Sequence, residues 1–240
     1  MSRQIETPPA EVVDYQEPFD ADKVPPLSFS TGNLFQQCPH QYYRLKVAKD
    51  VKDDFSHPVA LWGKRAHKAL EDFLLGVTKE LPDEFRQFSH YAHRLKQMEG
   101  DRFVERKMAV DASLKPVDFF DNRRARYRSI VDYLVIKGDT AFQIDHKTGK
   151  VKPSDQLAMS ALPIFAKYPR VQQIKGALYW LKHDTYTKYE YKREEAPAME
   201  SKLFRPVITA IRNAAETGYW PRQPSALCAY CPVKDCEYNR

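Results

Sequence analysis

The sequence predicts an α/β fold in which helices flank a central mixed β-sheet, and two patterns of apolar residues support this prediction. Apolar side chains recur at helical spacing over residues 60–77 and 199–217, so each segment is expected to bury one face of a helix. Over residues 102–110, 124–136 and 140–147 the period falls to two, which is typical of β-strands. Helices therefore precede the strands in the chain, and a further helix follows them.

The segments before the first strand are predicted to be helical. A short helix is expected to open at Ser28 and to stop at Cys38, which precedes a proline. Residues 60–77 predict a longer amphipathic helix with His67 at the edge of its apolar face, and residues 83–99 predict a second one.

Turns and a helix divide the later strands. Gly138 is expected in the hairpin between two of them. A helix is expected to start at Pro153 and run toward Phe165, and Pro163 should interrupt or kink it because proline cannot donate the helical hydrogen bond. Gly218 is expected to end the last helix. The remaining expected strands and that last helix span residues 173–182, 185–192 and 199–217.

Length and composition are those of an ordinary globular protein. The chain has 240 residues, 42% of them hydrophobic and 29% charged, which excludes collagen-like, mucin-like and wholly disordered classes. No stretch approaches the ~20 uninterrupted apolar residues of a membrane-spanning helix. The N-terminus also lacks the apolar segment of a secretory signal. We therefore expect a cytoplasmic protein with a single folded domain over residues 27–240.

The charge is divided unevenly along the chain. Residues 1–26 carry six acidic and two basic side chains together with five prolines, which predicts a disordered acidic arm. Because the whole chain has a formal net charge of +6, residues 27–240 carry +10. A basic domain suits a polyanionic partner such as DNA, although basic surfaces also serve solubility. The acidic arm is a candidate docking segment for a partner protein.

Three charged residues stand out in the predicted strands: Asp132, Asp145 and Lys147. Side chains alternate across a strand, so Asp145 and Lys147 are expected on the same face. The hairpin between the strands is expected to bring Asp132 beside Asp145. Two converging carboxylates suit Mg²⁺ or Mn²⁺, and a nearby ammonium can orient water or offset the charge of a phosphate. The alternative is a solvated strand edge with scattered charges.

Strand parity also predicts a basic track. Arg124, Arg126 and Arg128 share the parity of Asp132, so their side chains are expected on the face that holds this carboxylate. Such a row of arginines could bind the DNA backbone and lead it to the metal site. Glu105, in the preceding strand, either faces the same site or forms a surface salt bridge.

The order of these residues resembles that of the RecB-like branch of the PD-(D/E)xK nucleases. The matching residues run from a helix through two strands to a second helix: Gly63, His67, Glu71, Asp132, Asp145, Lys147 and Gln156. A tyrosine often follows the glutamine four residues later in that family, whereas Ser160 occupies the position here. The resemblance implies a restriction-endonuclease-like core and a metal-dependent DNA nuclease.

The resemblance also implies a role for each residue. The ligands of Mg²⁺ or Mn²⁺ would be His67, Asp132, Asp145 and the backbone carbonyl of His146. Glu71 would hold the second ring nitrogen of His67. Lys147 would serve the hydrolytic water, and Gln156 would position the motif or the DNA.

Four cysteines point to a second metal centre. Cys228, Cys231 and Cys236 lie in the loop-like segment 219–240, where the first two have a spacing that lets both thiolates bind one centre. The iron–sulfur variant of RecB-like nucleases, including CRISPR-associated members, holds a [4Fe–4S] cluster through one N-terminal and three C-terminal cysteines. By this resemblance Cys38 would complete a cluster that joins the chain ends. Zinc and a set of metal-free structural cysteines are the alternatives.

These observations together predict a divalent-metal-dependent deoxyribonuclease, an exonuclease rather than an endonuclease. It would act on DNA with single-stranded character in recombination, repair or phage DNA processing, in a bacterial or phage-infected cell. One alternative is a non-catalytic DNA-binding or assembly subunit that retains the fold. Another is a nuclease that acts only within a complex assembled through the acidic arm.

Overall fold

The central feature of the computed structural model, which describes residues 16, 18, 20–53 and 58–239, is one six-stranded sheet. Its strand order is β2-β1-β3-β4-β5-β6. All neighbouring strands are antiparallel except β4 and β5, which are parallel. This confirms the predicted mixed sheet. The strands are β1 (Asp101–Val110), β2 (Pro116–Val117), β3 (Tyr127–Lys137), β4 (Thr140–Lys147), β5 (Gln173–Trp180) and β6 (Thr185–Lys192).

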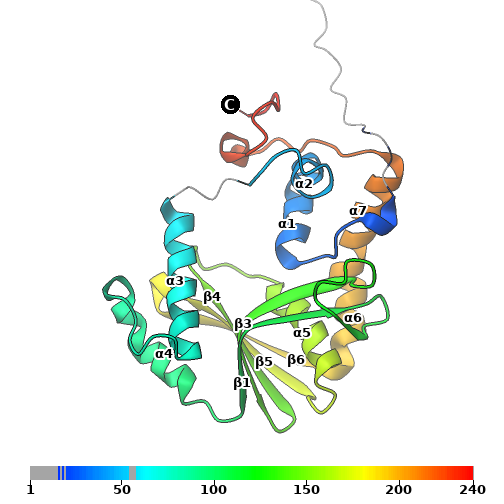
Figure 1. Ribbon diagram of the computed structural model, residues 1–240. Helices are drawn as coiled ribbons and strands as arrows, with labels where there is room; N and C mark the ends of the chain where they lie inside the picture. Colours follow the sequence, from blue (N-terminus) through cyan, green and yellow to red (C-terminus); the bar gives the residue numbers. More distant parts are fainter. Residues whose placement is uncertain (1–15, 17, 19, 54–57, 240) are drawn as a thin grey trace, which may run out of the picture.

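Helices cover both faces of this sheet (Figure 1). On one face, α3 and α4 enclose a core that includes Leu70, Phe73 and Tyr133. On the other face, α5 and α7 belong to a larger core together with α1. None of the described helices is long and apolar enough to span a membrane. The helices are α1 (Phe29–Gln37), α2 (Pro39–Tyr42), α3 (Pro58–Leu75), α4 (Ser89–Lys96), α5 (Gln156–Lys167), α6 (Ala196–Met199) and α7 (Arg205–Thr217).

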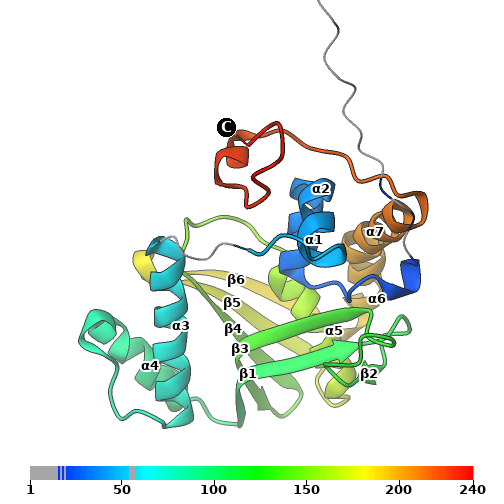
Figure 2. The same cartoon turned by 45° about the horizontal axis from the view of Figure 1, so that its top comes forward.

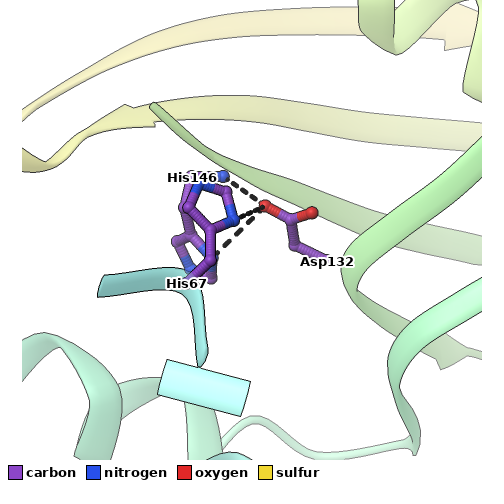
Figure 3. Close-up of side chains that lie close together, drawn as sticks. All are labelled: His67, Asp132 and His146. Carbon is purple, nitrogen blue, oxygen red and sulfur yellow. Dashed lines mark hydrogen bonds and ion pairs between the residues drawn. The ribbon is translucent and has the colours of Figure 1, made fainter. Parts of the chain in front are cut away.

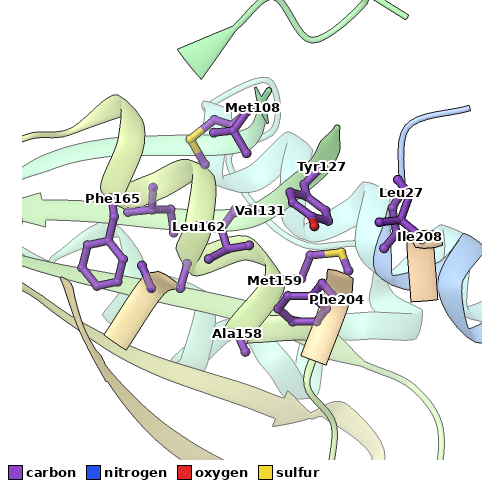
Figure 4. Packing of buried hydrophobic residues seen from close by; sticks show 14 of the residues in the cluster. Leu27, Met108, Tyr127, Val131, Ala158, Met159, Leu162, Phe165, Phe204 and Ile208 are labelled. Carbon is purple, nitrogen blue, oxygen red and sulfur yellow. The ribbon is translucent and has the colours of Figure 1, made fainter. Parts of the chain in front are cut away.

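Helix α5 lies at the centre of the larger core (Figure 4). It makes the crossover that parallel strands β4 and β5 require. Residues 157–165 are buried without exception, and Pro163 lies among them without ending the helix. Of the two expected effects of Pro163, an interruption of the helix is therefore excluded. Packing around the whole circumference of α5 stabilises the helix although proline leaves one hydrogen bond unmade.

The hairpin between β3 and β4 forms where it is predicted. Gly138 has a φ of +61°, in the left-handed region that tight hairpin turns require. The register pairs Tyr133 with Ile144, so one further step along the two strands places Asp132 opposite Asp145. The hairpin thus brings the two aspartates to neighbouring positions, as the sequence predicts.

The α1–α2 region and the C-terminal segment lie side by side (Figures 1 and 2). The backbone N–H of His40 donates to the carbonyl of Pro221 at 3.2 Å. The guanidinium of Arg44 forms an ion pair of 3.0 Å with Asp235. Segments nearly 200 residues apart in the sequence are therefore held together by direct contacts.

The predicted acidic arm falls mostly outside the described residues, and its last part differs from the expectation. Residues 20–26 are placed, with Ala21 and Val24 buried. The carboxylate of Asp22 forms an ion pair of 2.8 Å with Arg212 of α7. Two apolar side chains and one acidic residue thus attach the end of the arm to the domain.

Candidate active site

Three side chains that could hold a metal ion meet where α3 approaches the middle of β3 and the end of β4 (Figure 3). The Nδ1 atoms of His67 and His146 each lie 3.4 Å from Oδ2 of Asp132. The backbone N–H of His146 donates to the same oxygen at 2.8 Å. Within the described part of the chain, these three residues form the group whose ligand atoms all lie within 4.8 Å of one another. It is called the His67 group below.

A close contact between α3 and the end of β4 positions His67. Gly63 lies one helical turn before His67, and a Cβ at this glycine would lie 2.9 Å from Oγ1 of Thr148. The glycine therefore lets the helix approach the turn that follows Lys147. Ala66 and Leu70, on the adjoining face of the helix, are fully buried and anchor it to the sheet.

Asp145 belongs to a second set of contacts next to the first. The Nζ atom of Lys147 lies 2.7 Å from Oδ2 of Asp145. Gln156, the first residue of α5, bridges the pair, because its amide donates to Asp145 and its carbonyl oxygen accepts from Lys147. The structure thus brings together Asp145, Lys147 and Gln156. Asp145 contacts these two partners and is not a member of the His67 group.

Burial and neighbouring charges together shift the pKa values of Asp145, Asp132 and His67. Asp145 is only 5% exposed, and burial, followed by the charge of Asp132, raises its pKa to about 6 although Lys147 opposes the shift. Burial also disfavours ionised Asp132, but the hydrogen bond and charge of His146 outweigh it and lower the pKa. Burial lowers the pKa of His67 and favours the neutral imidazole. A carboxylate beside a neutral imidazole is a donor set that fits a divalent metal ion.

Glu105 is a further acidic residue at this site. The register between β1 and β3 places it opposite Asp132, and it lines one pocket with Asp132, His67 and Glu71. Burial and the charges of Asp132 and Glu71 raise its pKa to about 7. Its φ of +49° lies in the left-handed region, which costs a non-glycine residue about 1–2 kcal/mol. Glu105 therefore faces the site, which settles the choice that the sequence left open.

The supporting contacts of the two histidines differ from the expectation. Glu71, predicted to hold His67, forms an ion pair of 3.2 Å with Lys68. His146 is supported instead, since the hydroxyl of Tyr91 lies 2.8 Å from its Nε2. With Nε2 accepting this hydrogen bond, the imidazole proton lies on Nδ1 and points at Asp132; the opposite tautomer leaves Nδ1 free to bind a metal. Sequence reasoning missed Tyr91 because no motif connects α4 with β4.

Of the three arginines predicted to line the site, Arg128 alone lies in β3. Arg124 and Arg126 precede the strand, because the carboxylate of Asp121 accepts the backbone N–H of Arg124 and closes a turn there. Arg124 is also ion-paired to Asp121 at 2.6 Å, and both preceding arginines line a different pocket. Arg128 shares its pocket with Lys147. Of the predicted row of arginines, only Arg128 therefore lines the pocket of Lys147, and the prediction for Arg124 and Arg126 is wrong.

The four cysteines line one pocket between the α1–α2 junction and the C-terminal segment. All four thiols are free and half-buried: Cys38, Cys228, Cys231 and Cys236. Burial raises the pKa of the Cys231 thiol, and the other three thiols add to this shift. In the described residues the four do not approach one another as closely as the His67 group does. Their donor type fits an iron–sulfur or a zinc centre.

Comparison with known proteins identifies the family of this chain. The chain matches the PD-(D/E)XK nuclease superfamily over residues 26–236. Among solved structures it is similar to one titled "Crystal structure of SSO0001", with 14% sequence identity, a TM-score of 0.43, and coverage of 87% of this chain and 85% of that chain. No curated protein matches it. Because the family match spans the whole sheet and both sets of contacts at the site, the chain belongs to the PD-(D/E)XK nuclease superfamily.

Proposed function

We propose that this protein is a divalent-metal-dependent deoxyribonuclease that acts as an exonuclease. The observation that carries the proposal is the pair of adjoining contact sets, in which Asp145, Lys147 and Gln156 lie beside the His67 group. A protein that only bound DNA would gain nothing from two buried carboxylates near a phosphate, because they repel it.

Four oxygen and nitrogen ligands from the chain would bind Mg²⁺ or Mn²⁺, and water would complete the six-fold coordination. Asp132, Asp145, His67 and the backbone carbonyl of His146 would hold the ion. When bound, a divalent ion lowers the pKa of water and stabilises charge on a phosphate. The raised pKa values of Asp145 and Glu105 support this assignment, since a cation would relieve the repulsion among these buried carboxylates.

The remaining side chains would orient the reactants. The Lys147 ammonium can hold the attacking water and offset charge on the phosphate from its position beside Asp145. Gln156 fixes the side chains of both residues. Arg128 lines the same pocket as Lys147 and would bind a neighbouring phosphate.

A second part of the proposal is a [4Fe–4S] cluster held by the four cysteines. Their position around one pocket supports it, and the cluster would join the two chain ends there. Anaerobic purification followed by iron, sulfide and zinc analysis tests this assignment. Four irons and four sulfides per chain, with a visible absorption band that Cys231→Ser removes, are expected. One zinc per chain would contradict the iron–sulfur centre.

The activity is tested with end-labelled single-stranded and double-stranded DNA in the presence of Mg²⁺, Mn²⁺ or a chelator. We expect cleavage that requires the metal and starts at a strand end. Lys147→Ala should abolish it, whereas Lys150→Ala, an exposed lysine three residues on, should cut at the wild-type rate. DNA binding without cleavage in all three proteins would favour the binding subunit or a nuclease that needs a partner.

The biological setting is proposed from the resemblance of the motifs. We place the enzyme in recombination, repair or phage DNA processing inside a bacterial or phage-infected cell, with the acidic arm as a docking segment for a partner protein. Deletion of residues 1–19 should then weaken copurification with that partner while leaving the metal-dependent cleavage of naked DNA unchanged.

A further inference from the structure

We propose that Phe119 and Phe120 form a platform on which unpaired bases of the DNA stack beside the cleavage site. This inference rests on the proposed nuclease function and adds the form of its substrate. The two rings lie in the segment between β2 and β3, with centroids 5.1 Å apart and planes at 85°. Phe120 is 69% exposed, so its ring is open to a ligand.

Two cations lie against these rings. The guanidinium carbon of Arg128 is 4.8 Å from the centroid of the Phe119 ring, and Nζ of Lys107 is 5.5 Å from that of Phe120. Asn122 accepts a hydrogen bond of 3.1 Å from Arg128 and helps to hold it in place. Exposed aromatic faces interleaved with cations suit a chain that alternates bases with phosphates. An apolar protein segment would bring no negative charge to these two cations, so charge complementarity favours a nucleic acid.

The platform is continuous with the proposed active site. Phe119 and Arg128 line the same pocket as Lys147 and Gln156. Ile130 lines both this pocket and the one that holds Asp132. A strand whose phosphate lies at Lys147 would therefore place its next nucleotides over the aromatic pair.

Unmet hydrogen-bonding capacity in this pocket points the same way. Nε of Arg128 and Oγ of Ser129 are buried and have no hydrogen-bond partner among the described residues. Both residues line the pocket. Buried donors without partners are costly, and a strand that displaced the atoms covering them would satisfy them with its phosphate oxygens.

The stacking geometry selects the form of the DNA. A base inside a duplex has both of its faces covered by its neighbours, whereas a base in a single strand or an overhang offers a free face. We therefore expect the enzyme to bind a single strand or a duplex with an overhang more tightly than a blunt duplex.

A binding experiment without divalent cation separates base stacking from phosphate contacts. Fluorescence anisotropy compares a labelled oligothymidine with the same strand carrying abasic sites at its first three nucleotides from either end. Because base–aromatic stacking is worth about 1–3 kcal/mol per base, abasic sites at one end should weaken binding to the wild type by about 5-fold or more. The Phe119→Leu/Phe120→Leu variant should bind both strands equally weakly.

Two further variants control for folding and for the loss of an exposed aromatic. Tyr230→Leu removes a ring that is 78% exposed on the C-terminal segment and should keep the wild-type preference. Phe120→Trp should restore stacking, and its added fluorescence should be quenched by the intact strand but not by the abasic strand. A wild type indifferent to abasic sites, or a double-leucine variant as selective as the wild type, would overturn the platform.

Cleavage in Mg²⁺ is measured separately, which keeps this inference distinct from the proposed function. A wild type that binds bases through the platform and cuts no DNA would refute the nuclease while leaving the platform intact. A wild type that cuts DNA and binds both strands alike would refute the platform alone.

Discussion

Asp132 and Asp145 each lie one residue beyond the last paired residues of β3 and β4, Tyr133 and Ile144, and their different surroundings shift their pKa values in opposite directions. Asp132 contacts two imidazoles and its pKa is lowered, whereas Asp145 contacts an ammonium and an amide in a more enclosed position and its pKa rises to about 6. One strand pair thus carries a carboxylate that is ionised without a metal and one that a metal would help to ionise.

The bridge made by Gln156 gives the first prediction. Gln156→Ala leaves the ion pair between Lys147 and Asp145 but removes the side chain that fixes them. Outer contacts of this kind contribute about 10- to 100-fold to activity, so we expect a loss of that size in single-turnover cleavage. Gln172→Ala, at an exposed glutamine, is the matched control. Equal rates for both variants would contradict a positioning role for Gln156.

The raised pKa values predict how stability depends on pH. The pKa of Glu105 rises from 4.5 to about 7 and that of Asp145 from 3.8 to about 6, so the folded state binds these protons more tightly than the unfolded state. This contribution to stability is complete below pH ~4 and is lost as the pH rises to ~7. In a chelator, Glu105→Gln should therefore lose less Tm than the wild type between pH 5 and 7.5 in calorimetry.

Metal binding should counter that loss. A divalent ion that binds the ionised carboxylates stabilises the folded protein most where they have lost their protons. The rise in Tm on adding Mn²⁺ should therefore be larger at pH 7.5 than at pH 5, and Asp132→Asn should abolish it. Asp139→Asn, in the exposed hairpin turn, should respond as the wild type does. A rise in Tm that is the same at both pH values would place the ion elsewhere.

The contact between α3 and Thr148 predicts a steric effect on the site. Gly63→Val should push the helix from the end of β4 and displace His67, lowering both Mn²⁺ affinity and cleavage. Gly149→Val is the control, because a Cβ there meets nothing within 4 Å. For the smaller Gly63→Ala, the added change Thr148→Ala should restore activity in part, since it removes the clashing hydroxyl. Additive effects of the two changes would rule out this contact as the cause.

The hydroxyl of Tyr91 offers a test of how His146 is oriented. Tyr91→Phe keeps the buried ring but leaves Nε2 of His146 without that hydrogen bond, which should cost about 1 kcal/mol of folding free energy. Cleavage should fall about 10-fold or more because Asp132 loses its aligned neighbour. Chemical denaturation and cleavage rates measure the two effects. Tyr186→Phe, whose ring also contacts Tyr91, tests the loss of a phenol that does not contact the histidine.

Local patterns were enough to predict most of the fold. The hairpin at Gly138 and the C-cap at Gly218 were predicted because each requires a backbone conformation that glycine adopts readily. The start of β3 was misplaced because the turn at Asp121 depends on a side-chain hydrogen bond that strand periodicity does not reveal. Pro163 does not interrupt α5 because burial, which periodicity does not measure, stabilises the helix.

In the candidate site, too, local patterns predicted some residues, whereas others depended on tertiary contacts. Strand parity predicted that Asp145 and Lys147 share a face, and the family resemblance added Gln156; the three side chains lie in contact. The positions of Glu105 and Tyr91 at the site could be identified only from the folded structure. The first depends on the register between β1 and β3, and the second on how α4 packs over β4. The sequence motifs therefore predicted part of the site, and the remaining residues, Glu105 and Tyr91, could be found only from the tertiary structure.

Helix α1 has one end in each of two pockets. Ser28, its N-cap, lines the pocket of Lys147, and Cys38, at its other end, lines the pocket of the four cysteines. Nine helical residues span about 14 Å, a length over which a helix behaves as a stiff rod. A displacement of α1 at the cysteine pocket would therefore also move Ser28, which lines the pocket of Lys147 at its other end.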